Sequence, residues 1–191
     1  MSFFEPDRYF SRISAIDIQR DIVDKGFTHV FLDVDNTILR RDTHDVPRDV
    51  MFWIEKARGA GLEFCLVSNN WHQSVYEWAE RLDMPIVAKS IKPLPFAFLV
   101  ALRKVKGKRR TTLMIGDQLI TDVFGAHSVG MTCYMVCPLV EQDLKHTLLL
   151  RNVERMFIGD LHPESPVYES VQSEDAMVAE AQVSDSSKVH S

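Results

Sequence analysis

The length, composition and charge of the chain exclude several classes of protein. Its 191 residues suffice for one domain around a single hydrophobic core. Hydrophobic residues make up 46% and charged residues 26%, which is ordinary for a globular protein and too apolar for a disordered one. No apolar run approaches the roughly 20 residues of a spanning helix, and the first residues lack the pattern of a signal peptide. We therefore expect a cytoplasmic protein without a transmembrane segment.

The formal charge of −5 is unevenly distributed along the chain. From residue 160 to residue 191, seven acidic residues stand against one basic residue, a charge of −6, so residues 1–159 carry +1. The segment 160–191 is rich in Ser, Glu, Asp and Val and has no helical or strand periodicity. The sequence therefore predicts a folded domain over residues 1–159 and an acidic, disordered tail over residues 160–191.

Short apolar runs alternate with amphipathic segments, a pattern typical of a parallel sheet flanked by helices. A lead-in helix is predicted first, from the isoleucines between residues 13 and 22. Apolar residues then recur at helical spacing over residues 50–57, 75–82 and 98–105, so each of these segments has one apolar face. The predicted strands are residues 28–32, 62–67, 86–88, 112–115 and 132–136. The sequence thus predicts an α/β fold with a five-stranded parallel sheet.

Polar clusters follow four of these strands, at the carboxyl ends where the loops of a parallel sheet converge. Two carboxylates and a hydroxyl in the spacing Asp-x-Asp-x-Thr can hold a metal ion and a phosphate. Four clusters at four matching strand ends predict one catalytic site. In chain order the clusters are Asp33-Val34-Asp35-Asn36-Thr37, Ser68-Asn69-Asn70, Lys89 with Lys92-Pro93, and Gly116-Asp117-Gln118 with Thr121 and Asp122.

In their order and spacing, these motifs resemble those of the haloacid dehalogenase (HAD) superfamily of phosphohydrolases, and more closely its IIIA-type, YqeG-like branch. The resemblance includes Lys92-Pro93-Leu94-Pro95 and covers roughly residues 7–156. It implies a Rossmann-like, three-layer α/β/α fold and a phosphatase that acts through an aspartyl-phosphate. Related IIIA-type proteins include phosphatidylglycerophosphate phosphatases, so this lipid is the leading candidate substrate.

The roles that the resemblance implies agree with the chemistry of the residues. Asp33 would be the carboxylate nucleophile. Asp35 would protonate the leaving oxygen and then deprotonate the incoming water. The implied cofactor is Mg²⁺, which prefers oxygen ligands and would be bound by the carboxylates of Asp33 and Asp117 and the backbone carbonyl of Asp35.

Other residues would bind the phosphate or support the ligands. Lys92 would neutralise charge on the phosphoryl group. Ser68 and Asn69 would bind phosphoryl oxygens with neighbouring amides, and Thr37 would also orient the nucleophile loop. Thr121 and Asp122 would not touch the metal ion but would hold its ligands in position.

Each motif also has a purely structural interpretation. The residues from Asp33 to Asn36 could be ordinary turn formers, and Asp117 could cap a helix. Lys92 could be a surface lysine, with Lys89 as its replacement in the site. Asn70 could cap the next helix as readily as contact substrate.

The intervals between the motifs leave no room for a large cap domain. An uncovered crevice suits a phosphate displayed on a large or membrane-bound substrate, and a small-molecule phosphatase with a lid from a partner chain is the alternative. A second phosphate could be contacted by Arg40, Arg41, His44 and Arg48. The protein could bind peripherally to the inner face of the membrane through N-terminal aromatic residues, namely Phe3, Phe4, Tyr9 and Phe10. These side chains could equally pack on the fold.

The run from Arg103 to Arg110 carries six positive charges in eight positions and invites a nucleic-acid or anionic-lipid interpretation. It precedes the predicted strand 112–115, so we expect it at the amino ends of the strands, away from the site. A solvated helix end is the favoured interpretation, and nucleic acid is not an expected partner. A non-catalytic RNA- or protein-binding scaffold that uses this run remains the alternative function.

Overall fold

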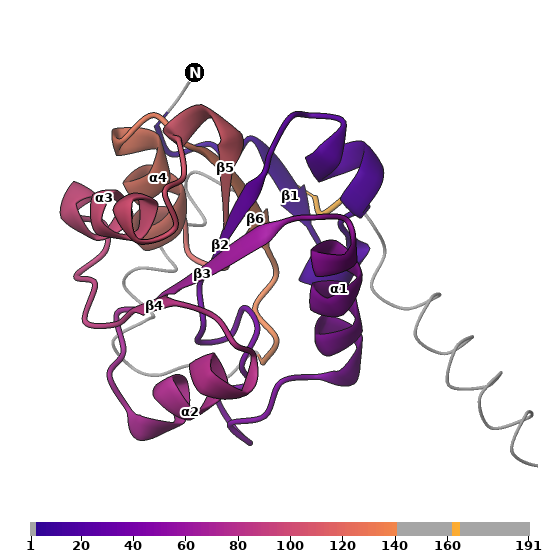
Figure 1. The fold of residues 1–191 in the computed structure, drawn as a ribbon, viewed down its shortest axis with the longest axis vertical. Helices are drawn as coiled ribbons and strands as arrows, with labels where there is room; N and C mark the ends of the chain where they lie inside the picture. The colour runs from indigo at the N-terminus through magenta and orange to yellow at the C-terminus, as the bar shows by residue number, and fades with distance from the viewer. Residues whose placement is uncertain (1–2, 141–161, 165–191) are drawn as a thin grey trace, which may run out of the picture.

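Six parallel strands form a single sheet in the order β1-β6-β5-β2-β3-β4 (Figure 1). The structure is a computed structural model that describes residues 3–140 and 162–164. The domain boundary at residue 159 and nearly all of the predicted acidic tail lie outside these residues. The strands are β1 (Arg8–Phe10), β2 (His29–Leu32), β3 (Glu63–Val67), β4 (Ile86–Val87), β5 (Thr112–Gly116) and β6 (Thr132–Val136). The predicted parallel α/β fold is confirmed.

The sheet has six strands rather than the predicted five, because Arg8–Phe10 pairs with the edge of β6. Three residues are too few to show a strand periodicity in the sequence, and this strand is defined by its partner. The predicted lead-in helix is present as two short helical turns, Ile13–Ala15 and Ile18–Val23.

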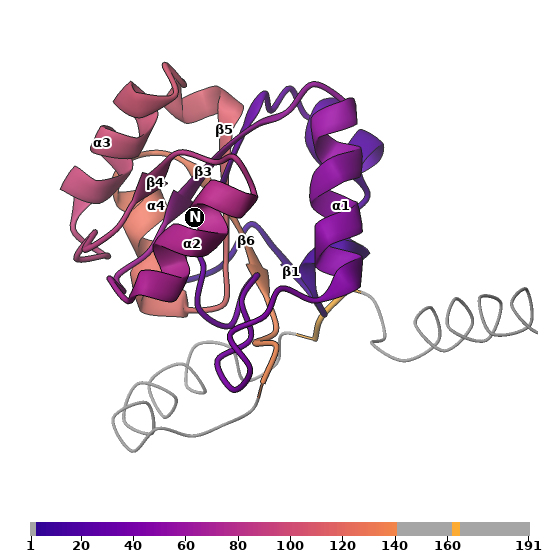
Figure 2. The ribbon, with the colours of Figure 1, turned by 60° about the horizontal axis from the view of Figure 1, so that its bottom comes forward.

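Helices cover both faces of the sheet, as the resemblance implied (Figures 1 and 2). α1 (Arg48–Gly59) and α2 (Gln73–Arg81) contribute to the core cluster on one face. α3 (Pro95–Lys104) and α4 (Gly125–Ser128) contribute to the cluster on the other. Two further short helical segments, Arg109–Thr111 and Leu119–Phe124, precede β5 and α4. Among the described residues, no helix is long and apolar enough to cross a bilayer.

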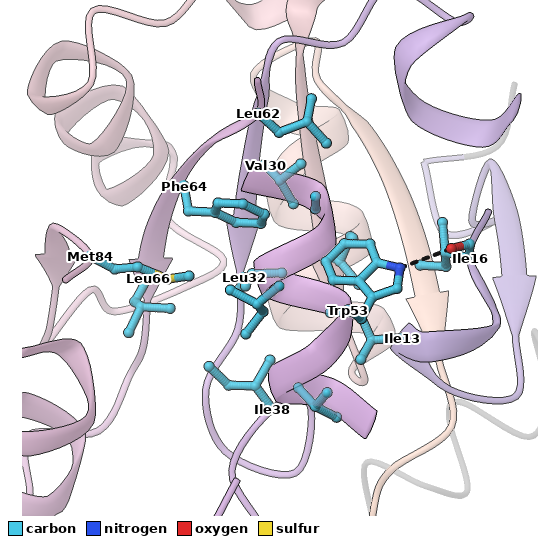
Figure 3. Packing of buried hydrophobic residues seen from close by; sticks show 14 of the residues in the cluster. Ile13, Ile16, Val30, Leu32, Ile38, Trp53, Leu62, Phe64, Leu66 and Met84 are labelled. Atoms are coloured by element: carbon cyan, nitrogen blue, oxygen red, sulfur yellow. Dashed lines mark hydrogen bonds between the residues drawn. The ribbon is translucent and has the colours of Figure 1, made fainter. Parts of the chain in front are cut away.

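The central strands are buried on both sides, which explains their continuous apolar sequences. In β2, Val30 and Leu32 pack in the cluster under α1, while Phe31 packs in the cluster under α3. Figure 3 shows the first cluster, where the Trp53 indole Nε1 donates a hydrogen bond of 2.8 Å to the carbonyl of Ile16. This contact ties α1 to the N-terminal turns.

The strand register brings the predicted motifs to one edge of the sheet. Leu32 at the end of β2 pairs with Ile115 of β5 and Leu66 of β3. The backbone N–H of Asp33 continues the ladder by donating to the carbonyl of Ile115 at 2.9 Å. Since these strands end level with one another, the residues that follow them emerge side by side.

A histidine in α4 holds the N-terminal segment in place. His127 Nε2 lies 2.8 Å from Oδ2 of Asp7, and Nδ1 lies 3.1 Å from the carbonyl oxygen of Phe3. Both partners are acceptors, so both contacts are hydrogen bonds only when the ring carries two protons. The bond to Asp7 raises the pKa of His127 against the effect of burial. Burial acts to raise the pKa of Asp7, but hydrogen bonds from His127 and the Cys133 backbone outweigh it and lower that pKa.

These shifts predict a pH-dependent contribution to stability. The His127 contribution is complete below the unfolded pKa of about 6.5 and is lost as the pH rises through the higher folded pKa. The Asp7 contribution is present above about pH 3.8 and is lost only in stronger acid. We expect Asp7→Asn to lower the free energy of unfolding by about 1–2 kcal/mol near pH 5.5, and by less near pH 9. Urea unfolding at both pH values measures this.

The control for this prediction is His127→Gln. In that background the effect of Asp7→Asn should lose its pH dependence, because the titrating partner is absent. An effect of Asp7→Asn that is the same at both pH values in the otherwise wild-type protein would contradict a charged pair.

Candidate active site

Loops from four strand ends enclose a pocket of about 270 Å³ at the carboxyl edge of the sheet. Residues from all four predicted clusters contribute to it. The structure therefore brings the four clusters, which the sequence placed after four different strands, to one pocket. The pocket is lined by Asp33, Asp35, Arg41, Asn69, Asn70, Lys92, Gln118 and Thr121.

A buried lysine lies at the centre of the site. The Nζ of Lys92 contacts Oδ1 of Asp33 and lies 2.6 Å from Oδ1 of Asp122. The Lys92 side chain is only 2% exposed, which excludes a surface lysine. Burial acts to lower the pKa of Lys92, but the charges of Asp122 and Asp33 outweigh it and raise that pKa. The ammonium is thus held charged inside the protein.

Three carboxylates gather around this ammonium. Asp33, Asp117 and Asp122 each place one oxygen within 4.8 Å of the others. Burial, reinforced by Asp122 and opposed by Lys92, raises the pKa of Asp33 to about 7. Burial and the charge of Asp33 also raise the pKa of Asp117. One ammonium cannot offset three carboxylates, so the cluster is suited to a divalent cation.

The hydrogen bonds indicate which carboxylates could hold such a cation. Both oxygens of Asp122 are occupied, Oδ1 by Lys92 and Oδ2 by the backbone N–H of Gln118 at 3.1 Å. Asp117 has a hydrogen bond to its side chain from Thr37 Oγ1, at a long 3.4 Å. Thr37 Oγ1 is equally far from Oδ2 of Asp33. Oδ2 of Asp33 and the carboxylate of Asp117, whose hydrogen bonds from Thr37 are long, could therefore bind a metal ion, while Asp122 contacts Lys92 directly.

The second aspartate of the first motif is held by the second motif. Asp35 Oδ2 accepts a hydrogen bond from Ser68 Oγ at 3.2 Å, and Oδ1 accepts one from Asn70 Nδ2 at 3.3 Å. Asn70 Oδ1 also accepts from the backbone N–H of Trp71 at 2.8 Å. Asn70 therefore forms a turn and holds Asp35, but it does not cap the next helix, because α2 begins at Gln73 with His72 at its N-cap and no side-chain cap bond.

Asn69 fixes the loop that carries the lysine. Its Oδ1 accepts from the backbone N–H of Lys92 at 2.6 Å, and its Nδ2 donates to the Lys92 carbonyl at 3.1 Å. Ser90 Oγ donates to the same Oδ1 at 2.9 Å. Thr121 lines the pocket and donates to Gln118 Oε1 at 3.1 Å. The structure therefore gives Asn69 a positioning role at the pocket wall.

Sequence reasoning missed one contact of the loop that carries Asp33. Asn36 has a positive φ of 66°, which Asn tolerates better than most residues. Its Nδ2 donates to the carbonyl of Val140 at 3.0 Å, and its Oδ1 accepts from the Val140 backbone N–H at 3.2 Å. The segment after β6 is thereby tied to the loop of Asp33. The partners are 104 positions apart, so no local pattern signals the contact.

A parallel sheet that carries an Asp-x-Asp-x-Thr loop, a buried lysine and a second acidic loop at its carboxyl edge defines a hydrolase of the HAD type. A family profile described as HAD-hydrolase-like matches residues 90–138. A curated relative, "Probable phosphatase YqeG" from Bacillus subtilis (strain 168), is 31% identical over 159 residues, which span 83% of this chain and 92% of the relative. The chain therefore belongs to the YqeG-like phosphatases of the HAD superfamily.

The fold is also that of solved structures. An uncharacterized protein from Listeria monocytogenes serotype 4b superposes with a TM-score of 0.50 and 17% sequence identity. The match covers 66% of this chain and 99% of that chain. This likeness supports the arrangement of strands and helices described above.

The last residue of β5 provides a sharp test of the site. A Cβ added at Gly116 would lie 2.3 Å from both Cγ and Oδ2 of Asp122, so any side chain there must displace this carboxylate. We expect Gly116→Ala to lower the turnover of p-nitrophenyl phosphate about 100-fold, because Lys92 loses Asp122, one of its two carboxylate partners, and shifts in the pocket. Overpacking should also lower the free energy of unfolding by about 1–3 kcal/mol.

Gly59→Ala is the matched control for this substitution. A Cβ at Gly59, in α1, would have nothing within 4 Å. We expect unchanged turnover and unchanged or slightly higher stability, since Ala favours a helix over Gly. Full activity of Gly116→Ala would show that the position of Asp122 is unimportant.

Proposed function

We propose that this phosphatase hydrolyses phosphate monoesters with Mg²⁺, through a covalent phosphate on Asp33. The observation that carries the proposal is the fixed carboxylate of Asp33, with one oxygen against Lys92 Nζ and the other 3.4 Å from Thr37 Oγ1. This carboxylate lines the pocket and faces the space that a phosphate would fill. A buried, oriented carboxylate beside a cation is what nucleophilic attack on a phosphate requires.

In the first step, an Asp33 oxygen forms a bond to phosphorus and the ester P–O bond breaks. The leaving oxygen takes a proton from Asp35, which Ser68 and Asn70 hold at the pocket wall. The charge of Lys92 offsets the negative charge of the transferring group.

In the second step, Asp35 is a carboxylate and removes a proton from water. The water oxygen bonds to phosphorus, and the P–O bond to Asp33 breaks. Inorganic phosphate leaves, and both aspartates return to their initial protonation states. One acid/base residue thus serves both steps in opposite directions.

The proposed cofactor fits the donors that the site offers. Mg²⁺ prefers oxygen ligands, and Asp33 and Asp117 would supply carboxylates, with the backbone carbonyl of Asp35 as the third protein ligand. When bound, the ion would offset the charge on the phosphate oxygens.

The size of the pocket supports a substrate that extends outside it. At about 270 Å³ it is below the roughly 300–1,000 Å³ of sites that enclose a small ligand. The interval between β2 and β3 holds only α1, and that between β3 and α3 holds only α2 and β4, so neither contains a cap domain. A phosphate displayed on a large molecule or a membrane would reach this pocket unhindered.

One basic residue at the pocket wall supports a substrate with a second anionic group. Arg41 lines the pocket, and its guanidinium makes no ion pair or hydrogen bond within residues 3–140 and 162–164. Two other residues predicted to contact a second phosphate have partners within the protein. Arg40 forms an ion pair with Asp42 at 2.9 Å, and the backbone carbonyl of His44 accepts a hydrogen bond from Trp78 Nε1. Phosphatidylglycerophosphate carries both a phosphate monoester and a phosphodiester, so we propose it as substrate, with Arg41 at the diester.

The alternative functions differ in what they require of the site. A small-molecule phosphatase would use the same residues and differ only in substrate. The scaffold alternative depends on the run from Arg103 to Arg110, which joins the end of α3 to the start of β5. The run is therefore at the amino edge of the sheet, opposite the pocket, and a phosphate bound there could not reach Asp33.

We expect the full chain with Mg²⁺ to release phosphate from phosphatidylglycerophosphate in mixed micelles. Asp33→Asn removes the nucleophile and should lower kcat by about 10³-fold or more. Asp42→Asn is the control, because this exposed aspartate lies outside the pocket. Retained activity in Asp33→Asn would overturn the covalent mechanism. Faster turnover of soluble sugar phosphates than of the lipid would overturn the lipid assignment alone.

Asp35→Asn should separate the two steps. The p-nitrophenolate ion leaves without needing a proton, so Asp33 can still be phosphorylated, whereas water is no longer activated. Stopped-flow absorbance should show a burst of p-nitrophenolate equal to the enzyme concentration, followed by turnover at least about 100-fold slower than wild type. Unchanged steady-state turnover would exclude Asp35 as the base.

A further inference from the structure

Exposed apolar side chains lie close in sequence to residues that line the pocket. Four of them occupy positions next to or within four residues of the pocket residues Asn70 and Lys92, and we call these four the apolar rim. Their exposed fractions range from 53% to 70%. The apolar rim consists of Trp71, Ile91, Leu94 and Phe96.

Backbone hydrogen bonds join the two segments that carry the rim. The backbone N–H of Ser90 donates to the carbonyl of Ser68 at 3.1 Å, and that of Lys89 donates to the carbonyl of Asn70 at 3.4 Å. Leu94 N–H donates to the carbonyl of Ile91 at 3.0 Å, just before α3 begins at Pro95. The rim is therefore held in place by the same loops that position Lys92.

The exposure of Ile91 is not explained by folding. Its φ is 52°, a left-handed conformation that a β-branched residue rarely adopts, and 67% of its surface is exposed. An apolar side chain that is both strained and exposed contributes little to the core. Its position instead fits contact with something outside the protein.

Basic groups accompany the apolar side chains. Lys89 Nζ lies 5.6 Å from the centroid of the Trp71 ring, and Lys89 makes no ion pair with the residues that the structure describes. Arg41 adds a second positive charge at the pocket wall. Aromatic and aliphatic side chains next to lysine are the composition of surfaces that bind anionic bilayers.

We propose that the apolar rim inserts into the headgroup region of an anionic bilayer and turns the pocket towards the lipid phosphates. A protein partner or a second copy of the chain seated on the rim would cover the pocket mouth, whereas a bilayer brings substrate to it. This proposal depends on the proposed function in one respect, because it takes the substrate to be a lipid.

Two of the N-terminal aromatic residues pack on the fold. Phe4 stacks on Phe124, with ring centroids 4.9 Å apart, and Phe10 is only 1% exposed. Phe3 is 56% exposed, with its ring 6.3 Å from that of Phe124. We assign the membrane-facing surface to the loops around the pocket, where exposed apolar side chains accompany basic ones.

Vesicle sedimentation of the full chain tests the rim. We expect binding to phosphatidylcholine vesicles with about 30% phosphatidylglycerol and weaker binding to pure phosphatidylcholine. The double variant Leu94→Ser with Phe96→Ser should partition roughly tenfold or more weakly, because two inserted side chains are lost. Serine at position 94 suits the N-cap of α3, so folding should be unaffected.

Phe52→Ser is the matched control for the double variant. Phe52 is 68% exposed, as exposed as Phe96, but it lies on α1, which covers the other face of the sheet. It should bind vesicles as wild type does. Brominated lipids should also quench Trp emission more strongly in the wild type than in Trp71→Phe, because of the two tryptophans that remain Trp53 is buried and Trp78 is half-buried, with its Nε1 bonded to the His44 carbonyl.

The outcomes separate this proposal from the proposed function. The double variant should hydrolyse soluble p-nitrophenyl phosphate at the wild-type rate and lose turnover only on vesicles. Vesicle binding without lipid turnover would support the rim and overturn the lipid substrate. Equal sedimentation of wild type, Phe52→Ser and the double variant would overturn the rim. A wild-type dimer that the double variant dissociates, seen by light scattering, would also overturn it by making the rim a self-interface.

Discussion

The charged Lys92 ammonium, held between Asp33 and Asp122, is the constraint on which the rest of the site depends. A buried ion pair contributes little net stability, because removing its charges from water costs about as much as their attraction returns. Removing one partner, however, leaves an uncompensated buried charge and costs about 3–5 kcal/mol. The triad is therefore better explained by chemistry than by folding. It keeps a cation beside a carboxylate at the spot where a phosphate would sit.

Much of the surrounding structure serves to hold these three side chains. Asn69 binds both the backbone N–H and the carbonyl of Lys92, and the missing side chain of Gly116 makes room for Asp122. Gly125, in α4, also makes room for neighbouring residues. A Cβ there would lie 2.7 Å from Phe98 and 3.3 Å from the Cα of Pro93, so α4 approaches both α3 and the lysine loop closely. The helical layer thus packs closely against the loop that carries Lys92.

The sequence predicted the parts of this arrangement that have a local signature. Alternating apolar runs located β2, β3, β5 and β6, and polar residues directly after them located the loops of Asp33, Ser68 and Asp117. The direct Asp122–Lys92 contact could not be predicted in this way. It depends on how the segment Leu119–Phe124 turns and on the path of a loop 30 positions away in sequence. The contact of Asn36 with Val140 and the pairing of β1 with β6 likewise have only distant partners.

The short intervals between the motifs link catalysis to substrate choice. In the proposed mechanism, Lys92 and the carboxylates would act only on the phosphoryl group, which is common to all phosphate monoesters and so cannot distinguish among them. With only α1 between β2 and β3, and α2 and β4 before α3, no inserted domain encloses the rest of the substrate. Selectivity must then come from groups at the pocket mouth. The structure offers two kinds of group there. One is the guanidinium of Arg41, which forms no ion pair with the residues that the structure describes, and the other is the exposed side chains of the apolar rim. A lipid phosphate at a bilayer surface would contact both at once, whereas a soluble sugar phosphate would leave the rim unused.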